Sequence, residues 1–476
     1  MKNVSREQIL QRLGRENPWW QAPHQVPDIY HEWHPRSYLT SFFSLVRQHD
    51  VRRAIVLMGP RRVGKTVLIH HTIMHLLEDK VPPETICYVS VDHPLYNGLG
   101  LEELLQLFAE SNDVDLLKSR AYVFFDEIQY LQNWEVHLKS LVDSYPNLDI
   151  VASGSAAAAL RLKSTESGAG RFTNFLLPPL TFQEYLMLLG LEGLIRSPKK
   201  ERALYQSSDL DELNQQFLHY LNFGGYPEVI FSQRIQEDPA RFIKADIIDK
   251  VLLRDLPSLY GIQDIRELNS LFTTLAFNTA NEVSLEALSK GSGVAKNTIK
   301  KYIEYLDAAF LIRVVHRVDR NARHFKRANF FKVYLTNPSI RAALFSPIEE
   351  DDTAMGDLVE TATFAQWFHS DAPLHYARWK HGEVDIVRLE AQQKPIWAVE
   401  TKWSDRIVDH PEELCGLTSF CATNHLEAAL VTTKTRREHK IVDGIRIDFV
   451  PASEYCYTVG KNLVGSGSMD QYHLQS

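Results

Sequence analysis

This sequence lacks the features of several protein classes. No apolar run approaches the roughly 18–20 residues that span a bilayer, and the polar start of the chain lacks the apolar core of a signal peptide. The four cysteines show no CxxC spacing, which disfavours both a zinc site and a disulfide framework. We find no internal repeat and no long low-complexity tract. The sequence therefore predicts a cytoplasmic globular protein with no membrane partner.

Acidic residues outnumber basic ones overall, but one stretch reverses this balance. The formal net charge is −8. Residues 290–332 nevertheless contain eleven Lys and Arg against three Asp and Glu, a local net charge of +8. Clustered basic residues are the usual footprint of a polyanion partner. We therefore expect a nucleic acid, DNA in the first instance, to bind through residues 290–332.

A phosphate-binding loop follows an apolar strand near residue 60. Residues 54–58 are continuously apolar, as in a parallel strand covered on both faces. The motif GxxxxGK[ST] is then matched by Gly59, Pro60, Arg61, Arg62, Val63, Gly64, Lys65 and Thr66. Its backbone N–H groups can cradle phosphates, while Lys65 neutralises their charge and the Thr66 hydroxyl binds Mg²⁺. Because no base-reading NKxD motif accompanies the loop, ATP is favoured over GTP.

A second predicted strand supplies the acidic residues that such a loop needs. The stretch AYVFFDEIQYL places Asp126 and Glu127 at the end of an apolar run. Asp126 can hold the Mg²⁺ shell, and Glu127 can orient or deprotonate the attacking water. Ser153, after the next short strand, could sense the γ-phosphate, and Arg171 could reach a phosphate of its own chain or of a neighbour. Ordinary loop residues are the alternative for both.

The basic stretch has the pattern of a helix-turn-helix. A short helix, a Gly-containing turn and a longer helix are predicted within residues 284–310, and two strands follow, as in a winged helix. Basic side chains on the longer helix and between the strands suit phosphate contacts. A winged helix that binds protein and exposes a solvated basic face is the alternative.

Charged residues interrupt two predicted strands near the C-terminus. In GEVDIVRLEAQQKPIWAVETKW, a hairpin would lay Asp385 beside Glu400, and Lys402 shares a face with Glu400. Two carboxylates suit Mg²⁺, which would activate water against a phosphodiester, and Lys402 would stabilise the developing charge. Glu360, on the preceding predicted helix, could complete the site. An exposed hairpin with a Glu–Lys pair is the competing interpretation.

Several of these stretches together resemble a known family. They are GPRRVGKT, FFDEIQYL, ASGSAAA, GRFTNFLLPPLTFQEYL, GGYPEV and the EVDIV…VETKW pair, and the resemblance covers nearly everything from residue 40 to residue 450. The chain looks like the prokaryotic AAA-type, STAND-related ATPases with a winged helix and a C-terminal PD-(D/E)xK nuclease-like domain of unknown function (number 4143). The resemblance implies an α/β P-loop NTPase domain with a helical lid, a winged-helix domain and a C-terminal α/β restriction-endonuclease-like domain. It also implies that Asp385, Glu400 and Lys402 form the nuclease triad.

On this basis we divide the chain into six parts. They are an N-terminal extension (1–39), a P-loop ATPase core of the AAA type (40–185), a helical lid (186–264), a winged helix (265–345), a nuclease-like domain (346–458) and a tail (459–476). The N-terminal extension is expected to pack on the ATPase core. His70, His71 and His75, on the helix after the phosphate loop, are interpreted as a solvated face because no acidic partner stands at zinc-binding spacing.

ATP and Mg²⁺ are the expected cofactors, and a second copy of the chain is a candidate partner. The predicted function is ATP hydrolysis coupled to nucleic-acid binding and to metal-dependent phosphodiester cleavage, in DNA processing or defence. The alternative is an ATP-gated, non-enzymatic switch or regulator whose nuclease-like domain is inactive and only binds.

Overall fold

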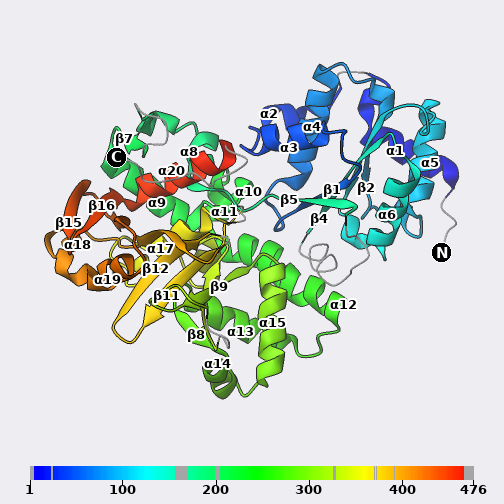
Figure 1. Cartoon of the computed structure of the whole chain (residues 1–476). Helices are drawn as coiled ribbons and strands as arrows, with labels where there is room; N and C mark the ends of the chain where they lie inside the picture. The colour runs from blue at the N-terminus through cyan, green and yellow to red at the C-terminus, as the bar shows by residue number, and fades with distance from the viewer. Residues whose placement is uncertain are drawn as a thin grey trace. The chain divides into compact units, whose positions relative to one another are not determined.

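The chain divides into two compact units. Figure 1 shows the computed structural model, which describes residues 5–22, 25–155, 170–198, 204–324, 329–368, 370, 372–390 and 392–465. The two units are Met1–Leu177 and Pro178–Ser476. The first unit thus ends before the ATPase boundary predicted at residue 185.

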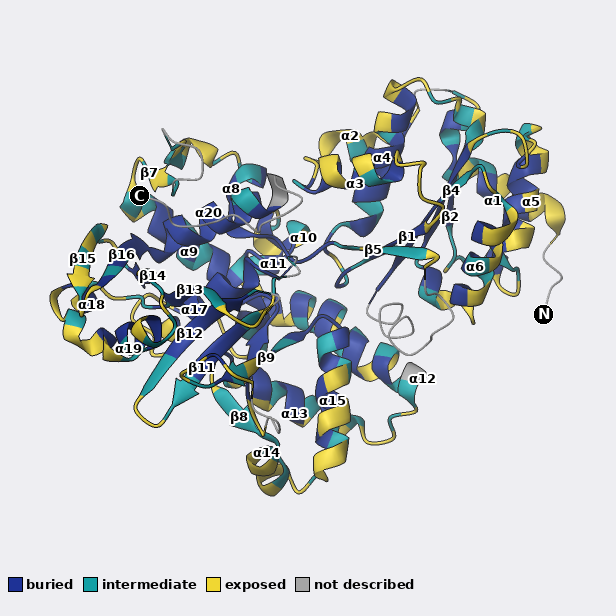
Figure 2. Ribbon diagram, in the orientation of Figure 1, coloured by how far each residue is buried: buried dark blue, intermediate teal, exposed yellow. Residues whose placement is uncertain are grey.

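The first unit is built on a parallel five-stranded sheet with the strand order β2-β3-β4-β1-β5. Its strands are β1 (Ala54–Met58), β2 (Ile86–Ser90), β3 (Ala121–Asp126), β4 (Leu148–Gly154) and β5 (Phe172–Leu176). Its helices are α1 (Arg6–Glu16), α2 (Asp28–Glu32), α3 (Leu39–Val46), α4 (Lys65–Glu78), α5 (Leu101–Asn112) and α6 (Trp134–Ser144). The apolar runs predicted as strands become β1 and β3, which are buried almost throughout (Figure 2). The carboxyl ends of β1, β3 and β4 meet at one edge of the sheet, where ligands of parallel α/β sheets bind.

The N-terminal extension belongs to this unit and covers the edge of the sheet at β2. Asn17 donates through Nδ2 to the Tyr88 carbonyl (2.8 Å) and accepts from the Tyr88 N–H (2.6 Å). Trp19 and Trp20 donate their indole N–H groups to the Ile86 carbonyl at 3.0 and 2.7 Å. Covering an edge strand in this way removes backbone groups that could pair with another chain.

The second unit begins with helices that share a core with helices from the far end of the chain. Buried Phe182, Tyr185, Phe217 and Tyr220 of α8 (Phe182–Leu188) and α9 (Leu210–Phe223) pack against α17 (Met355–Ala365) and α20 (Ala452–Gly465). The stretch predicted as a lid continues through α10 (Pro227–Ile230), α11 (Gln233–Glu237), two π-helical segments (Ala240–Asp249 and Val251–Asp255) and α12 (Leu256–Tyr260). Because α20 runs to Gly465, the tail predicted from residue 459 begins inside a helix.

A nine-stranded sheet joins the two segments predicted as separate domains after residue 264. Its strand order is β15-β16-β14-β13-β12-β11-β9-β10-β8. The strands are β8 (Glu282–Ser284), β9 (Ile312–Val318), β10 (Phe330–Leu335), β11 (Leu374–Trp379), β12 (Gly382–Leu389), β13 (Pro395–Glu400), β14 (Ala428–Thr433), β15 (Glu438–Val442) and β16 (Ile445–Pro451). The junction is the parallel pairing of β9 with β11, at Arg317 with Tyr376 and at Val318 with Ala377. Residues 265–345 and 346–458 therefore share one sheet.

Most helices and strands of these two segments match the sequence-based expectation. The remaining helices are α13 (Ile265–Phe277), α14 (Leu285–Ser292), α15 (Lys296–Ala308), α16 (Ser339–Leu344), α18 (Arg406–Asp409) and α19 (Cys415–Thr423). The predicted helix-turn-helix corresponds to α14 and α15, and the predicted charged hairpin to β12 and β13. Strands β15 and β16 and helix α20 were not predicted. None of the described helices is long and apolar enough to cross a membrane.

Candidate functional site

The phosphate-binding motif lies between the carboxyl end of β1 and the first turn of α4. Gly64 has a φ of +94°, which favours glycine, and a Cβ at this position would meet nothing within 4 Å. The space beside the loop at Gly64 is therefore open. The buried Lys65 ammonium donates to the carbonyls of Gly59 (3.0 Å) and Pro60 (2.8 Å), so it lies inside the curve of the loop.

The first glycine of the motif is required for a close backbone contact. A Cβ on Gly59 would lie 2.2 Å from the carbonyl oxygen of Leu177. The Leu177 N–H donates to the Met58 carbonyl at 2.8 Å, which fixes this approach. Leu177 is also the last residue of the first unit. The phosphate loop is thus in direct contact with the segment that leads to the second unit.

Asp126 is the centre of a set of hydroxyl groups. It is buried, and its Oδ2 accepts hydrogen bonds from the Thr66 hydroxyl (2.7 Å) and the Tyr88 hydroxyl (2.9 Å). Its Oδ1 accepts from the Ser153 hydroxyl at the end of β4. Within the described ranges, no Lys, Arg or His side chain forms an ion pair with Asp126. Sequence reasoning missed Tyr88, because nothing distinguishes it within the apolar β2 run.

Glu127 is held in an unusual conformation beside Asp126. Its φ is +56°, a conformation that is sparsely populated by non-glycine residues and recurs at functional sites. Burial raises the pKa of its carboxyl above the ordinary value, although the Lys65 ammonium opposes this. The Gln129 amide donates to the Glu127 carboxylate and accepts from the Ser155 N–H (3.2 Å). Gln129, two positions after Glu127 in DEIQ, was also missed.

The N-terminal extension contacts the phosphate loop and its helix. Arg36 is buried and donates to the Val63 carbonyl at 2.6 Å. The Tyr30 ring stacks on His70 with the ring centres 3.8 Å apart, and the His71 ring lies 2.8 Å from the Tyr30 carbonyl. His70 and His71 are therefore buried, and the prediction of a solvated histidine face is wrong for both. These contacts agree with the expectation that the N-terminal extension packs on the ATPase core.

Arg171 lies at the other end of the sheet from the phosphate loop. It immediately precedes β5, whose first residue Phe172 pairs with Ala54, the first residue of β1. Its Nε donates to Asp143 at 3.0 Å. Since β1 and β5 are parallel and the loop follows the last residue of β1, Arg171 does not reach the phosphate site of its own chain. A role at a neighbouring chain's nucleotide stays a prediction.

These residues fit an Mg²⁺-bound nucleoside triphosphate. The open space at Gly64 and the buried ammonium in the loop are complementary to phosphates, and the buried Asp126 carboxylate, which has no ion-pair partner among the described residues, is complementary to a divalent ion. Thr66 and Asp126 would hold the ion, and residues 59–66 the phosphates. The bound nucleotide supplies the phosphoryl group. Glu127 would accept the proton of the attacking water, for which a raised pKa is suitable.

The predicted C-terminal residues also come together, where β12 and β13 pair. The Asp385 Oδ2 accepts from the Thr401 N–H at 2.9 Å and lies 3.9 Å from the Lys402 Nζ. The Lys402 Nζ donates to Glu400 at 2.8 Å. Glu360 of α17 faces the same cluster and is buried like Asp385. The hairpin geometry predicted for Asp385, Glu400 and Lys402 is present.

A lysine from β10 lies inside this cluster. The Lys332 Nζ is 2.9 Å from Glu360 Oε1, 2.9 Å from Glu383 Oε1 and 3.3 Å from Asp385 Oδ1. Lys332 is only 3% exposed, and the neighbouring Tyr334 hydroxyl donates to Glu360 at 2.6 Å. Lys332 is one of the eleven basic residues of the stretch 290–332. A charge within the apolar run FFKVYL is the signal that could have identified it as a buried group.

The electrostatics of this cluster favour an internal ion-pair network. Burial and the nearby Asp385 carboxylate raise the pKa of Glu360 to about 7 and that of Glu400 to about 8. Burial opposes the ionisation of Asp385, but the ammonium groups of Lys332 and Lys402 outweigh it and lower the pKa of Asp385. Asp385 is therefore the carboxylate that the two lysines keep ionised.

As the side chains lie, this cluster does not fit a divalent ion. The Lys332 ammonium already bridges Glu360 and Asp385, the carboxylates that an ion would have to share. In the part of the chain that the structure describes, no group of three or more His, Cys, Asp or Glu side chains is arranged to hold a metal ion. We therefore derive no metal-dependent step from Asp385 and Glu400.

The basic stretch is partly neutralised by ion pairs. Its pairs are Lys296–Glu286 (3.7 Å), Lys300–Glu304 (3.9 Å), Arg313–Asp307 (4.0 Å) and Arg317–Glu282 (3.6 Å). Among the described residues, exposed Lys290, Lys301, Arg320 and Arg323 form no ion pair. Lys326 and Arg327 lie outside the described residues.

Comparison with known families assigns the first unit. Residues 51–186 match the AAA domain family, and the phosphate loop and the strand-end acids lie within this range. Residues 51–186 form an AAA-type ATPase domain. Residues 214–352 match a domain of unknown function, DUF8612, which includes the stretch predicted as a winged helix.

The similar proteins themselves do not extend this assignment. The chain is 25% identical over 342 residues to an uncharacterized protein of Methanocaldococcus jannaschii, with 66% of this chain and 67% of the relative covered. It is 23% identical over 412 residues to an uncharacterized protein of Haemophilus influenzae, with 85% of this chain and 95% of the relative covered. The S. cerevisiae Hsp104–ADP complex is similar at 14% identity and a TM-score of 0.29, with 57% of this chain and 37% of the Hsp104 chain covered. C. elegans PCH-2 is similar at 18% identity and a TM-score of 0.26, with 44% of this chain and 61% of the PCH-2 chain covered. Likeness at these TM-scores assigns neither a fold nor a function to this chain.

The geometry predicts separable roles for Lys65 and Glu127. Lys65→Ala should abolish nucleotide binding and turnover, because the loop loses the charge that neutralises phosphate. Glu127→Gln should retain binding but lower kcat on the order of 100-fold, because the acceptor for the water proton is lost. Phosphate release and nucleotide affinity measure the two effects, with Lys118→Ala, an exposed lysine, as the control. Normal turnover by Lys65→Ala would refute the assigned site.

Acidification should destabilise the ATPase domain through His70. Burial lowers its pKa to about 4 from an ordinary 6.5, so the unfolded chain binds this proton more readily. The stability is present above pH 6.5 and is lost as the pH falls towards 4. Between pH 7 and 5.5 we expect a loss of about 1 kcal/mol. Denaturant unfolding over this range should give a flatter profile for His70→Gln than for wild type or the half-exposed control His75→Gln.

Proposed function

We propose that this protein hydrolyses ATP and uses the nucleotide state to control nucleic-acid binding by its second unit. The contact between Gly59 and Leu177 is the observation that carries the coupling. Nucleotide binding acts on the phosphate loop, and a loop packed this tightly cannot shift without displacing the Leu177 backbone. Leu177 continues directly into Pro178, the first residue of the second unit.

The nucleic-acid partner is supported by the exposed face of α14, α15 and the described part of the β9–β10 loop, which we interpret as a winged helix. Exposed Lys290, Lys301, Arg320 and Arg323 are available for phosphates. Lys296 and Lys300 are more than half exposed in their ion pairs. Exposed pairs of this kind contribute little, so phosphates can compete for both lysines. The binding that this face supports is electrostatic and carries no base-reading pattern.

The C-terminal cluster favours a binding domain over a nuclease. Lys332 supplies the positive charge that a divalent ion would otherwise bring, which supports the non-enzymatic alternative. Phosphodiester cleavage stays a second candidate because of one observation. The Glu400 Oε2 is buried and has no hydrogen-bond partner among the described residues. Cleavage through this cluster would require Lys332 to leave it.

Charge reversal at Lys301, Arg320 and Arg323 should weaken nucleic-acid binding and lower its salt dependence. Each lost phosphate contact reduces the slope of log K against log salt by about 0.9 on duplex DNA. Fluorescence anisotropy with a random-sequence duplex should therefore give a triple variant with a slope smaller by about 2–3. Arg266→Glu, an exposed change on α13, is the matched control.

The same assay tests the coupling. Glu127→Gln with ATP and wild type with ADP should bind the duplex with different affinities. Equal affinities in both nucleotide states would contradict the proposal, and so would salt-independent binding.

Measuring turnover at several protein concentrations tests whether Arg171 acts on a neighbouring chain. Arg171→Ala should lose turnover only at concentrations that allow assembly, if this arginine acts on a neighbour.

Removing the buried Lys332 ammonium distinguishes a binding domain from a nuclease at the C-terminal cluster. Lys332→Met leaves three carboxylates without their common partner and should destabilise the second unit by about 3–5 kcal/mol. Mg²⁺ or Mn²⁺ should not restore this stability, nor should wild type cleave DNA with either ion. Lys394→Met, exposed in the β12–β13 loop, is the control. Restored stability together with cleavage that Glu400→Ala abolishes would establish the second candidate.

A further inference from the structure

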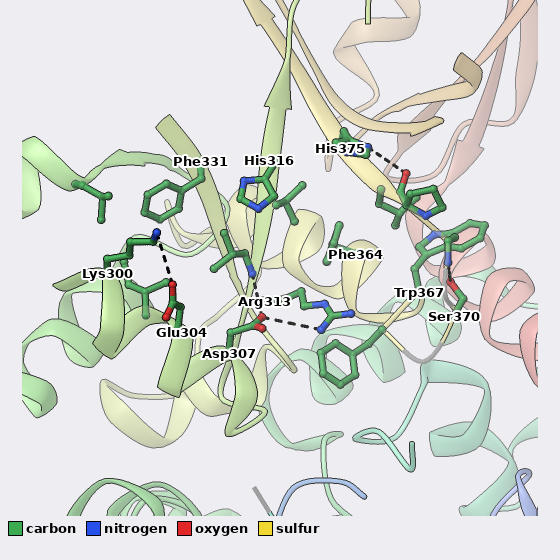
Figure 3. Close-up of a pocket in the computed structure, with 18 residues that line it drawn as sticks. Lys300, Glu304, Asp307, Arg313, His316, Phe331, Phe364, Trp367, Ser370 and His375 are labelled. Atoms are coloured by element: carbon green, nitrogen blue, oxygen red, sulfur yellow. Dashed lines mark hydrogen bonds and ion pairs between the residues drawn. The ribbon is translucent and has the colours of Figure 1, made fainter. Parts of the chain in front are cut away.

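A large cleft opens between α15 and the strand β11, within the second unit. It has a volume of about 690 Å³ and is bounded by α15, β9, β11 and the end of α17. In Figure 3, Lys300, Glu304 and Asp307 of α15 lie on one side, and Trp367, Ser370 and His375 on the other. The proposed ATP site and the carboxylate cluster do not use this cleft.

The cleft exists because two neighbouring strands of the sheet separate. β9 pairs with β10 over Ile312–His316, but with β11 only at Arg317 and Val318. In the described ranges, the earlier part of β9 therefore has no strand on its second side. Alternation along an antiparallel ladder turns the backbone groups of Val314 and His316 to this side. The Val314 N–H is held by the Asp307 carboxylate at 3.4 Å, which confirms the direction.

The floor of the cleft is apolar and aromatic. It includes Phe331 of β10, Phe364 of α17, and Trp367 and Phe368 just beyond α17. These four rings are each less than 10% exposed. They form a fixed surface that can receive apolar side chains, whereas the rim above them is polar.

The charges around the cleft are balanced. Lys300 lies beside Glu304 at 3.9 Å, and Arg313 beside Asp307 at 4.0 Å. Burial lowers the pKa of His375 to about 4, so this wall is neutral at ordinary pH. A polyanion would meet two carboxylates for the two cations, which disfavours nucleic acid here. A segment with one acidic and one basic side chain is complementary to both pairs.

We propose that this cleft binds an extended peptide segment of a partner protein, added as a strand to the free edge of β9. Main-chain hydrogen bonds to Val314 and His316 would give affinity, as in strand addition generally. Alternate apolar side chains of the peptide would pack on the aromatic floor. Its charged side chains would pair with Lys300 and Glu304 at the rim. The proposed peptide site shares Lys300 with the basic face but does not use Lys301, Arg320 or Arg323.

The test is a selection of displayed random heptapeptides on the full-length chain, followed by anisotropy with the enriched peptides made synthetically. We expect sequences with alternating apolar positions and at least one charge. Ala372→Trp, which fills the cleft from its partly exposed wall, should weaken their binding at least tenfold. Lys300→Glu should remove the preference for an acidic residue at one peptide position, and Glu304→Lys should remove the preference for a basic residue at another. Arg266→Glu should leave binding unchanged, and melting curves check that each variant is folded.

Three results would overturn the proposal. One is the absence of enriched alternating sequences in repeated selections. Another is peptide binding that Ala372→Trp and a proline placed in the centre of the peptide both leave intact. The third is an oligonucleotide, single-stranded or duplex, that occupies the cleft instead. Its competition with the bound peptide would reveal this, with Ala372→Trp as the control. Peptide binding that the cleft and proline variants both abolish supports it.

Discussion

The arrangement of the second unit depends on one buried ammonium group. Lys332 reaches from β10 to Glu360 on α17 and to Glu383 and Asp385 on β12. Three elements from two predicted domains therefore share a single charge. A buried charge is tolerated only when it is paired and hydrogen-bonded, so separating these elements would leave carboxylates in an apolar environment. The β9–β11 pairing joins the same two predicted domains through the backbone, because separating them would leave strand backbone groups unpaired. Together they make residues 265–458 one structural body instead of a DNA-binding module with an appended second domain.

The first unit depends on a different constraint, the absence of a side chain at Gly59. The Leu177 carbonyl occupies the position of a Cβ, and any larger residue would push the phosphate loop and the exit segment apart. Arg36 and Tyr30 of the N-terminal extension contact the same loop and the helix that follows it. Segments from before β1 and after β5 thus both contact the phosphate loop and its helix. In the proposed function, these contacts, more than the motif itself, would let the site report its nucleotide state to the rest of the chain.

The sequence predicts local features of this structure well and long-range features poorly. The phosphate loop, the strand ending in Asp126 and the Asp385–Glu400 hairpin follow from motif spacing and strand alternation, which are local properties. The position of Lys332 does not, because it depends on two strands, β9 and β11, that are far apart in the chain and pair over only two residues. His70 and His71 are polar residues on a predicted helix, and only the tertiary contact with Tyr30 buries them. The prediction that Arg171 reaches a phosphate of its own chain is wrong because Arg171 directly precedes β5 and so lies at the amino-terminal end of that strand. The sequence did not reveal this strand.

The two carboxylate clusters differ in how their charge is compensated, and this difference separates their chemistry. Asp126 is surrounded by the hydroxyl groups of Thr66, Tyr88 and Ser153, which stabilise an anion but bring no positive charge. Such a site retains its affinity for a cation from solution. Asp385 lies between two ammonium groups of the same chain, so most of the electrostatic gain that a divalent ion would offer is already present. An ion entering there must displace Lys332 into an apolar sheet, whereas an ion entering beside Asp126 displaces nothing charged. An aspartate therefore suits a divalent ion at the end of β3 and an internal ion-pair network within β12.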